Sequence, residues 1–356
     1  MRILLFFFML LPIAIFSQKN EPDYSLTNPT FLDSTLNNYN LFFSAEMHWR
    51  KENSDRKKNI IKYLSERHSL DFIVAERSYA FGHWVNYYLE TGDTLLLREF
   101  LSVDNFFSIK NGKLYEDEYN FYRWLREFNI SNNLSIKVVG IDMASFWRGK
   151  PILWSFLKFT DHNLILKDKF RTDIIKAKEL ILKDKLSTNN IEKWLKGVNL
   201  TTSKTKIKDI HFSNYLYNLN QSIKWARGNK MNYRDSEIAS NFKKYIPKDK
   251  KVYGQYGGGH IVLKSEERIP FQSFVSILNQ ESNYKGKILS IGLICFDCNE
   301  FGEFPGDDLY IPFLTKEEFL RLKSQFLKLP HNTFIDLRQT NEIIKEYGQL
   351  LLIEYD

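Results

Sequence analysis

The sequence predicts an α/β fold, in which helices flank a mainly parallel central sheet that carries a helical insertion. Five short apolar runs are typical of strands buried on both faces, and segments of helical periodicity separate them. The runs are "NLFFSAE" (40–46), "DFIVAE" (71–76), "IKVVGID" (136–142), "KKVYGQY" (250–256) and "KILSIGLICF" (287–296). The final "QLLLIEYD" (349–356) is predicted to be an edge strand.

Helices are expected between these strands. Residues 54–68 place apolar side chains on one face, and "SYAFGHWVNYYLETGD" (78–93) forms a second helix that Gly92 ends as a C-cap. The stretch 150–248 has repeated helical periodicity and no clear strand pattern. We therefore expect a single α/β domain over 19–356, with a helical insertion at about 150–248 packed against the sheet.

The first 18 residues, "MRILLFFFMLLPIAIFSQ", are typical of a secretory signal peptide. Arg2 provides a positive n-region, the apolar stretch after it is too short to cross a bilayer comfortably, and Ser17 is a small residue for cleavage. Because polar "QKNEPDYS" follows directly, a cleaved signal is favoured over an uncleaved anchor. We expect a secreted or periplasmic protein with no stable membrane span after cleavage.

The net charge of +7 does not indicate a nucleic-acid partner. Basic and acidic residues are interleaved, as in "KDKFRTDIIKAKELILKDK" (167–185), and this pattern is typical of a solvated amphipathic helix. The sequence contains no recognised nucleic-acid motif, and export also argues against DNA as a partner.

The two cysteines form a C-x-x-C pair, Cys295 and Cys298, in "ICFDCNEFG". Outside the cytosol such a pair could close as a disulfide. Redox catalysis is disfavoured, because a thioredoxin-type pair normally opens a helix early in a βαβ unit, whereas this pair ends an apolar run late in the chain. Two ligands alone do not define a zinc site either.

Ionisable side chains follow the first four strands, at the edge where open α/β sheets bind ligands. From the first strand to the fourth they are Glu46 and His48, Glu76 and Arg77, Asp142, and His260. Each has an ordinary structural explanation by itself, as an ion pair, a helix cap or a hydrogen-bonded wall residue. Together at one edge they would be costly unless they converged on something polar, so we predict a shared functional site.

The remaining histidines are predicted to have structural roles. His83 lies in a helix rich in aromatic residues, where a packing role is expected. The others, His68, His162, His211 and His331, are scattered along the chain and are predicted to lie at the surface.

Four segments in a fixed order carry a family resemblance. They are "FFSAEMHWRKEN", "FIVAERSYAFGHWVNYYLETGD", "VVGIDM" and "MNYRDSEIASNFKKYI…KVYGQYGGGHI". In this order they resemble motifs of the erythromycin esterases and their broader relatives, which include the haem-binding lipoprotein ChaN and the Tiki-type proteases. The resemblance spans about 40–262 and implies an α/β core with a deep cleft. It also implies hydrolysis of a lactone ester by water rather than by a serine nucleophile, and no G-x-S-x-G motif is present.

The resemblance also implies catalytic roles. His48 would be the general base, Glu76 would orient it or the water, and Glu46 and His260 would complete the polar cluster. These residue types suit the chemistry, since a histidine titrates near neutral pH and an adjacent carboxylate can fix its tautomer.

Three further residues, Arg234, Arg77 and Asp142, are predicted to bind substrate. In the family, the arginine that matches Arg234 would steady a carboxylate or the developing oxyanion. The chain departs from the family pattern in its last loop, where Gly257 stands in place of a histidine that the esterases often carry.

The leading hypothesis is a secreted hydrolase of an ester or lactone bond that acts on a small-molecule substrate and requires no cofactor. A second is a metal-dependent hydrolase, with Glu46, His48, Glu76 and His260 as ligands of a divalent ion such as zinc or manganese. A third is a non-catalytic protein that binds haem or another bulky ligand, which the missing second histidine favours. A wholly structural role is disfavoured by the clustered ionisable groups.

Overall fold

The structure of the chain, a computed structural model, describes residues 25, 30–33, 35–46, 52–104, 113–144, 149–205, 207–228, 231–263, 271–296, 333–336 and 350–355. The predicted signal peptide, His48, Cys298 and His331 lie outside these residues. Within them, no helix combines the length and the apolar character that a membrane span requires.

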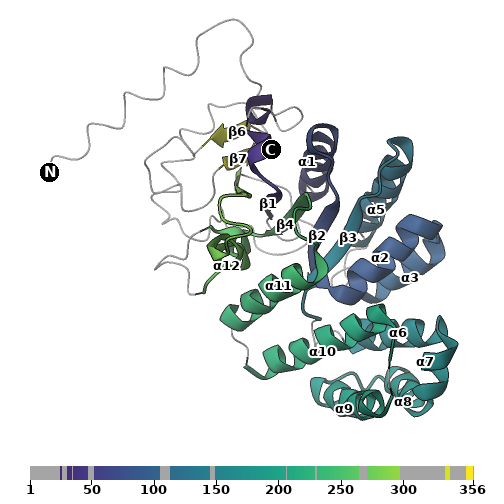
Figure 1. Cartoon of the computed structure of the whole chain (residues 1–356). Helices are drawn as coiled ribbons and strands as arrows, with labels where there is room; N and C mark the ends of the chain where they lie inside the picture. Colours follow the sequence, from purple (N-terminus) through teal and green to yellow (C-terminus); the bar gives the residue numbers. More distant parts are fainter. Residues whose placement is uncertain are drawn as a thin grey trace, which may run out of the picture.

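A seven-stranded sheet forms the centre of the fold, in the order β3-β2-β4-β1-β5-β7-β6 (Figure 1). The strands are β1 (Leu41–Glu46), β2 (Phe72–Ser78), β3 (Lys137–Asp142), β4 (Val252–Gly257), β5 (Ile288–Phe296), β6 (Thr333–Asp336) and β7 (Leu350–Tyr355). Neighbouring strands are parallel except β6 and β7, which are antiparallel. The predicted fold class, α/β with a mainly parallel sheet, is confirmed.

The five predicted buried strands correspond to β1–β5, but the edge of the sheet differs from the prediction. The C-terminal run forms β7, which lies between β5 and β6 and is not the edge strand. The edge is β6, a strand of four residues that the sequence did not predict. So short a run gives no alternation that separates it from a loop.

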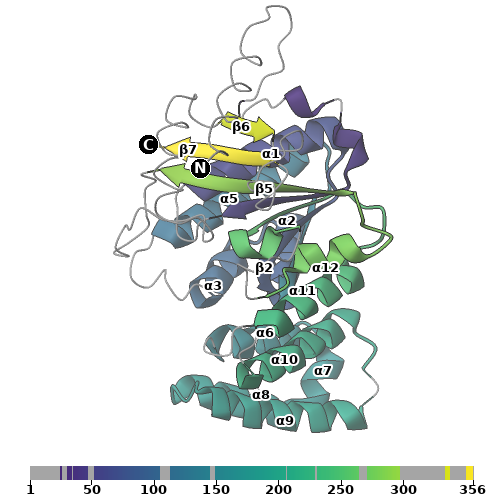
Figure 2. The same ribbon diagram turned by 90° about the vertical axis from the view of Figure 1, so that its left-hand side faces the viewer.

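Helices cover both faces of the sheet, and successive residues of β1 show how. The ring of Phe42 lies 5.5 Å from that of His68 on α1 (Glu52–His68). The next residue, Phe43, faces the other way, toward α11 (Met231–Tyr245) and α12 (Phe274–Gln280), with 5.2 Å between its ring and that of Phe274. In Figure 2, α11 and α12 lie next to each other below strand β5. Burial on both faces explains why these strands are apolar throughout.

The remaining helices precede and follow β3. They are α2 (Tyr79–Thr91), α3 (Thr94–Asp104), α5 (Lys113–Ser131), α6 (Gly149–Asp161), α7 (Leu164–Lys169), α8 (Arg171–Leu182), α9 (Thr188–Lys204) and α10 (Ile210–Gly228). Helices α6–α10 gather below the sheet in Figure 1 around aromatic side chains, with Phe156 against Phe170, Trp194 and Phe212. Short 3₁₀ helices occur at Thr30–Leu32, Leu36–Asn38 and Gly258–Ile261.

The histidines divide between surface and interior. His162 and His211 are exposed, as predicted, and His83 packs among aromatic rings. The surface prediction for His68 is wrong: its side chain is buried, and its Nε2 lies 2.8 Å from the carbonyl oxygen of Tyr39. A hydrogen bond to a backbone carbonyl lets a buried imidazole keep a partner.

Helix α2 packs directly on β3, the strand at the other edge of the sheet. The side-chain amide of Asn86 donates to the carbonyl oxygen of Val138 at 2.7 Å, and its oxygen accepts from the Val138 amide at 2.8 Å. The helix therefore satisfies backbone groups that an edge strand would otherwise expose. Gly82 permits this approach, since a Cβ atom there would lie 2.5 Å from the backbone nitrogen of Gly140.

The variant Gly82→Ala is expected to lose about 1–3 kcal/mol of stability, because the added methyl group would meet backbone atoms that cannot rotate away. Helix propensity alone predicts a gain of about 1 kcal/mol for the same change. Urea unfolding shows whether the free energy of unfolding falls or rises in the variant. The matched control is Gly228→Ala at the end of α10, where a Cβ atom meets nothing within 4 Å. A Gly82→Ala protein as stable as this control would contradict the close packing.

Candidate functional site

The site lies at the carboxyl edge of the sheet, where β2 and β4 end side by side. Glu76 is near the end of β2, and its Oε2 accepts the backbone N–H of Gly257, the last residue of β4, at 3.0 Å. The parallel pairing of β2 with β4, in which Ala75 lies opposite Gln255, brings the ends of the two strands together. A charge-assisted hydrogen bond therefore holds the carboxylate of Glu76 at the carboxyl edge of the sheet.

Arg234, in the first turns of α11, joins the ends of β2 and β3. Its Nη2 donates to Oε1 of Glu76 at 2.6 Å and to Oδ2 of Asp142 at 2.5 Å, and its Nε lies 3.2 Å from both oxygens of Asp142. The three side chains are 17%, 13% and 8% exposed, respectively. Burial lowers the pKa of Arg234, but the charges and hydrogen bonds of Asp142 and Glu76 outweigh burial and raise that pKa above its usual value. The guanidinium is thus a permanent positive charge between two carboxylates.

His260 forms a hydrogen-bonded pair with Asp235. The Nδ1 of His260 lies 2.9 Å and 3.1 Å from the two oxygens of Asp235, and Asp235 Oδ1 also accepts the backbone N–H of Phe274 at 2.8 Å. The Nε2 lies 3.1 Å from Arg234 Nη1 and 3.7 Å from Glu76 Oε1. In the neutral imidazole, Nδ1–H donates to Asp235, and the lone electron pair of Nε2 faces Arg234.

The surroundings of His260 favour its charged form. Burial lowers the pKa of His260, but the hydrogen bond to Asp235 and the charge of Glu76 outweigh this effect and raise the pKa above its usual value. The imidazole can therefore hold a proton on Nε2 near neutral pH, next to Glu76. A histidine in these surroundings can accept or donate a proton at the carboxyl edge of the sheet.

Helix α10 binds the backbone at the end of β3 and at the start of α2. Asn218 donates from Nδ2 to the backbone carbonyl of Asp142 at 2.9 Å and accepts the N–H of Tyr79, the first residue of α2, at 3.2 Å. The ring of Trp225 on the same helix lies 6.0 Å from the guanidinium carbon of Arg234. The helices between β3 and β4 thus hold the strand ends and the arginine in place.

Four of the predicted site residues meet in the described part of the chain. Glu76, Asp142, Arg234 and His260 form one connected cluster. Glu46 ends β1 opposite Gly257, half-buried, and its charge acts on the neighbouring Tyr256. His48 lies outside the described residues.

Arg77 is directed away from this cluster. Its Nη2 donates to Glu118 of α5 at 3.3 Å, and its guanidinium carbon lies 5.4 Å from the centre of the Phe81 ring. Glu76 reaches Arg234 of α11 whereas Arg77 reaches α5, and the pairing of β2 with β3 shifts register between Ala75 and Ser78. The structure therefore places Arg77 in a contact between β2 and α5.

Two residues of the site were not predicted from the sequence. Asp235 directly follows Arg234, so the "RD" pair was the available signal. Tyr256 is fully buried near the end of β4, and the sequence predicts a tyrosine inside an apolar strand to be a core residue. Neither signal separates a functional side chain from a structural one without the geometry.

The described residues offer no ready metal site. Among them, no group of three or more His, Cys, Asp or Glu side chains is arranged to hold a metal ion. Around Glu76 and Asp142, the positive charge is supplied by the guanidinium of Arg234. His48, the fourth ligand of the metal hypothesis, lies outside the described residues.

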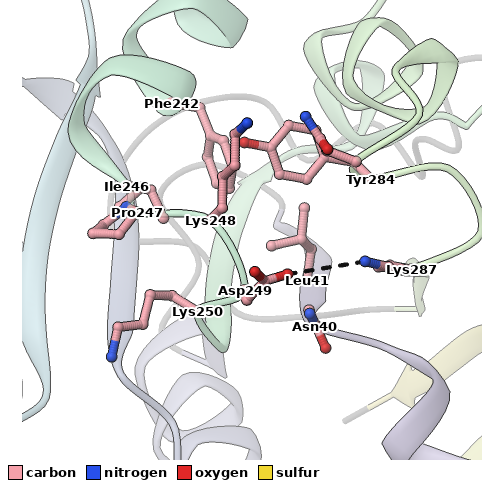
Figure 3. A pocket seen from close by; sticks show the side chains of 11 residues that line it. Asn40, Leu41, Phe242, Ile246, Pro247, Lys248, Asp249, Lys250, Tyr284 and Lys287 are labelled. Carbon is pink, nitrogen blue, oxygen red and sulfur yellow. Dashed lines mark ion pairs between the residues drawn. The ribbon is translucent and has the colours of Figure 1, made fainter.

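A small hollow lies at the opposite edge of the sheet, where the strands begin (Figure 3). Asn40, Lys250 and Lys287 are among the residues that line it. Lys287 lies 4.0 Å from Asp249, and Lys250 pairs with Asp71 at 2.8 Å. None of the predicted site residues that the structure describes borders this hollow, so the candidate site remains the cluster at the carboxyl edge.

The fold is shared with proteins of solved structure. A protein from Bacillus cereus superposes with a TM-score of 0.58 at 14% identity, over 95% of this chain and 94% of that one. A succinoglycan biosynthesis protein gives a TM-score of 0.61 at 12% identity, over 95% and 93%. No protein-family model matches the chain, and the comparison with curated proteins gives no match. At these identities the likeness establishes the α/β fold.

One of these structures is an enzyme of the resembled family. A mutant of the erythromycin esterase EreC, in its open conformation, superposes with a TM-score of 0.58 at 11% identity, over 91% of this chain and 92% of that one. The protein therefore has the fold that EreC also has, along nearly its whole length.

Proposed function

We propose that the protein is a secreted or periplasmic hydrolase that cleaves an ester or lactone bond with activated water. The observation that carries the proposal is the Asp235–His260 pair beside the carboxylate of Glu76, which Arg234 fixes at the carboxyl edge of the sheet. The fold shared with EreC agrees with this reaction class. The signal peptide predicted over residues 1–18 supports export.

In the proposed reaction, two histidines divide the proton transfers. His48, which follows β1 by two residues in the sequence, accepts a proton from water as its oxygen adds to the carbonyl carbon. The tetrahedral intermediate then collapses, the bond to the leaving oxygen breaks, and that oxygen takes a proton from Nε2 of His260. Asp235 keeps the imidazole of His260 in the orientation and tautomer that this step needs.

The test is product mass after incubation of the mature protein with a panel of lactones and simple esters, macrolides included. A product heavier by one water, lost in both His48→Ala and His260→Asn, is the expected result. The matched control is His162→Ala, which removes an exposed imidazole directly after α6. A chelator is added in a parallel series, and loss of turnover there would favour the metal-dependent hypothesis. Absence of turnover for every compound, with the protein folded, would overturn the proposal.

A further inference from the structure

The hydroxyl group of Tyr256 is a buried hydrogen-bond donor without a partner among the described residues. The side chain is 0% exposed, and its Oη contacts no protein donor or acceptor in this part of the chain. Tyr253, three residues earlier in β4, is also 0% exposed, but its hydroxyl lies 2.7 Å from Ser44 Oγ. The unpartnered hydroxyl of Tyr245 belongs to a side chain that is only half-buried. Tyr256 is therefore the fully buried exception among these tyrosines.

The ring of Tyr256 is held on the face of the sheet that carries the site. It packs against Phe274 with 4.9 Å between ring centres and against Phe43 with 6.4 Å. Phe43 also packs against Phe242 of α11, the helix that carries Arg234, and Arg234 bonds to Glu76. Glu76 and Tyr256 therefore project from neighbouring strands toward the same side.

The charges of the site act on this hydroxyl. Burial raises the pKa of Tyr256 well above 10.0, and the carboxylates of Asp142 and Glu76 raise it further against the opposing effect of Arg234. The phenol consequently stays protonated at any working pH and remains a donor. A buried donor of this kind is costly unless an acceptor reaches it, and phenylalanine would fill the same apolar walls without that cost.

The donors of Arg234 are largely committed to the protein. Its Nε and Nη2 bond to Asp142 and Glu76, and its Nη1 faces His260. An arginine held in this way organises the carboxylates but has little capacity left for a substrate oxygen. The site therefore needs another donor for a carbonyl oxygen that becomes negative.

We propose that Tyr256 is a catalytic residue whose hydroxyl donates a hydrogen bond to the carbonyl oxygen of the scissile ester or lactone. This inference rests on the proposed function. As water adds to the carbonyl carbon, the π electrons move to that oxygen, and the bond from Tyr256 strengthens without proton transfer. When the carbonyl re-forms and the leaving oxygen departs, the hydrogen bond weakens again. The stabilisation is largest in the transition state, where it accelerates the reaction.

The test compares Tyr256→Phe with the matched control Tyr253→Phe, from the same strand. For p-nitrophenyl butyrate, kcat of Tyr256→Phe is expected to fall roughly 100-fold with KM changed less than about threefold, as for removal of one oxyanion donor. Calorimetric affinity for butylphosphonic acid, whose tetrahedral oxygens mimic the intermediate, should fall at least about tenfold by the same reasoning. The melting temperature should not fall, because the substitution removes no hydrogen bond to any residue that the structure describes.

The two readouts separate this inference from the proposed function. Wild-type hydrolysis that Tyr256→Phe retains in full, with unchanged phosphonate affinity, would overturn the role of Tyr256 alone. A wild type that binds the phosphonate through Tyr256 but hydrolyses nothing would overturn the esterase function and keep Tyr256 as the ligand contact. A lower melting temperature in Tyr256→Phe than in Tyr253→Phe, with wild-type kcat, would assign a structural role instead.

Discussion

Replacing Arg234 by alanine is expected to lower the free energy of unfolding by about 3–5 kcal/mol and to abolish turnover. The guanidinium bonds to both Glu76 and Asp142, whose side chains are 13% and 8% exposed. Removing it leaves two carboxylates close together, with little water and no counter-charge between them. The loss therefore reflects uncompensated buried charge more than the strength of the original pair.

Urea unfolding of Arg234→Ala measures this loss, and Lys243→Ala on the same helix is the matched control. Lys243 pairs with Glu281 at 2.6 Å, but the two side chains are 38% and 35% exposed, so the control should lose less than about 1 kcal/mol. Arg234→Lys should fall between the two, since lysine keeps the charge but cannot bridge both carboxylates with a planar fork. Equal losses for Arg234→Ala and Lys243→Ala would contradict the central role of the guanidinium.

The central strands could be predicted because their burial leaves a direct trace in composition. Phe42 and Phe43 of β1 are both buried against helices on opposite faces, so the run is apolar at every position. The edge strand β6 could not be found in the same way, because four residues carry no periodicity. The order of the strands is also absent from composition, although parallel pairing predicts that their carboxyl ends share one edge.

The site could be predicted in outline for the same geometric reason. Glu76, Asp142 and His260 follow parallel strands, and they meet around Arg234. Arg77 does not join this cluster: β2 is irregular between Ala75 and Ser78, and the guanidinium of Arg77 bonds to Glu118 of α5.

The partners that refine the site depend on packing. Asp235 reaches His260 only because the first turns of α11 lie over the end of β4, and Tyr256 is distinguished from a core tyrosine only by its unpartnered hydroxyl. Such features follow from tertiary contacts, which no local pattern encodes.

Acid is expected to destabilise the protein through His83, by up to about 3 kcal/mol between pH 6.5 and pH 4. The ring of His83 lies 4.6 Å from Phe159 and 4.7 Å from His211, at the junction of α2, α6 and α10. Burial, followed by the charges of His211 and His162 against that of Asp209, lowers the pKa of His83 from 6.5 to about 4. Between these values the unfolded chain binds a proton that the folded protein does not, so stability falls as the pH falls.

Urea unfolding at pH 7.5 and pH 4.5 isolates this effect when His83→Phe is compared with wild type. Carboxylates contribute to acid sensitivity in both proteins, so the informative quantity is the difference between their two losses, expected at about 2–3 kcal/mol. The control is Lys176→Gln, which alters an exposed side chain on α8 that does not act on the pKa of His83, and it should retain the wild-type loss. If His83→Phe and wild type lost the same stability on acidification, the junction of α2, α6 and α10 would have to accept a charged imidazole. The aromatic packing around His83 would then have to open to water in the folded protein.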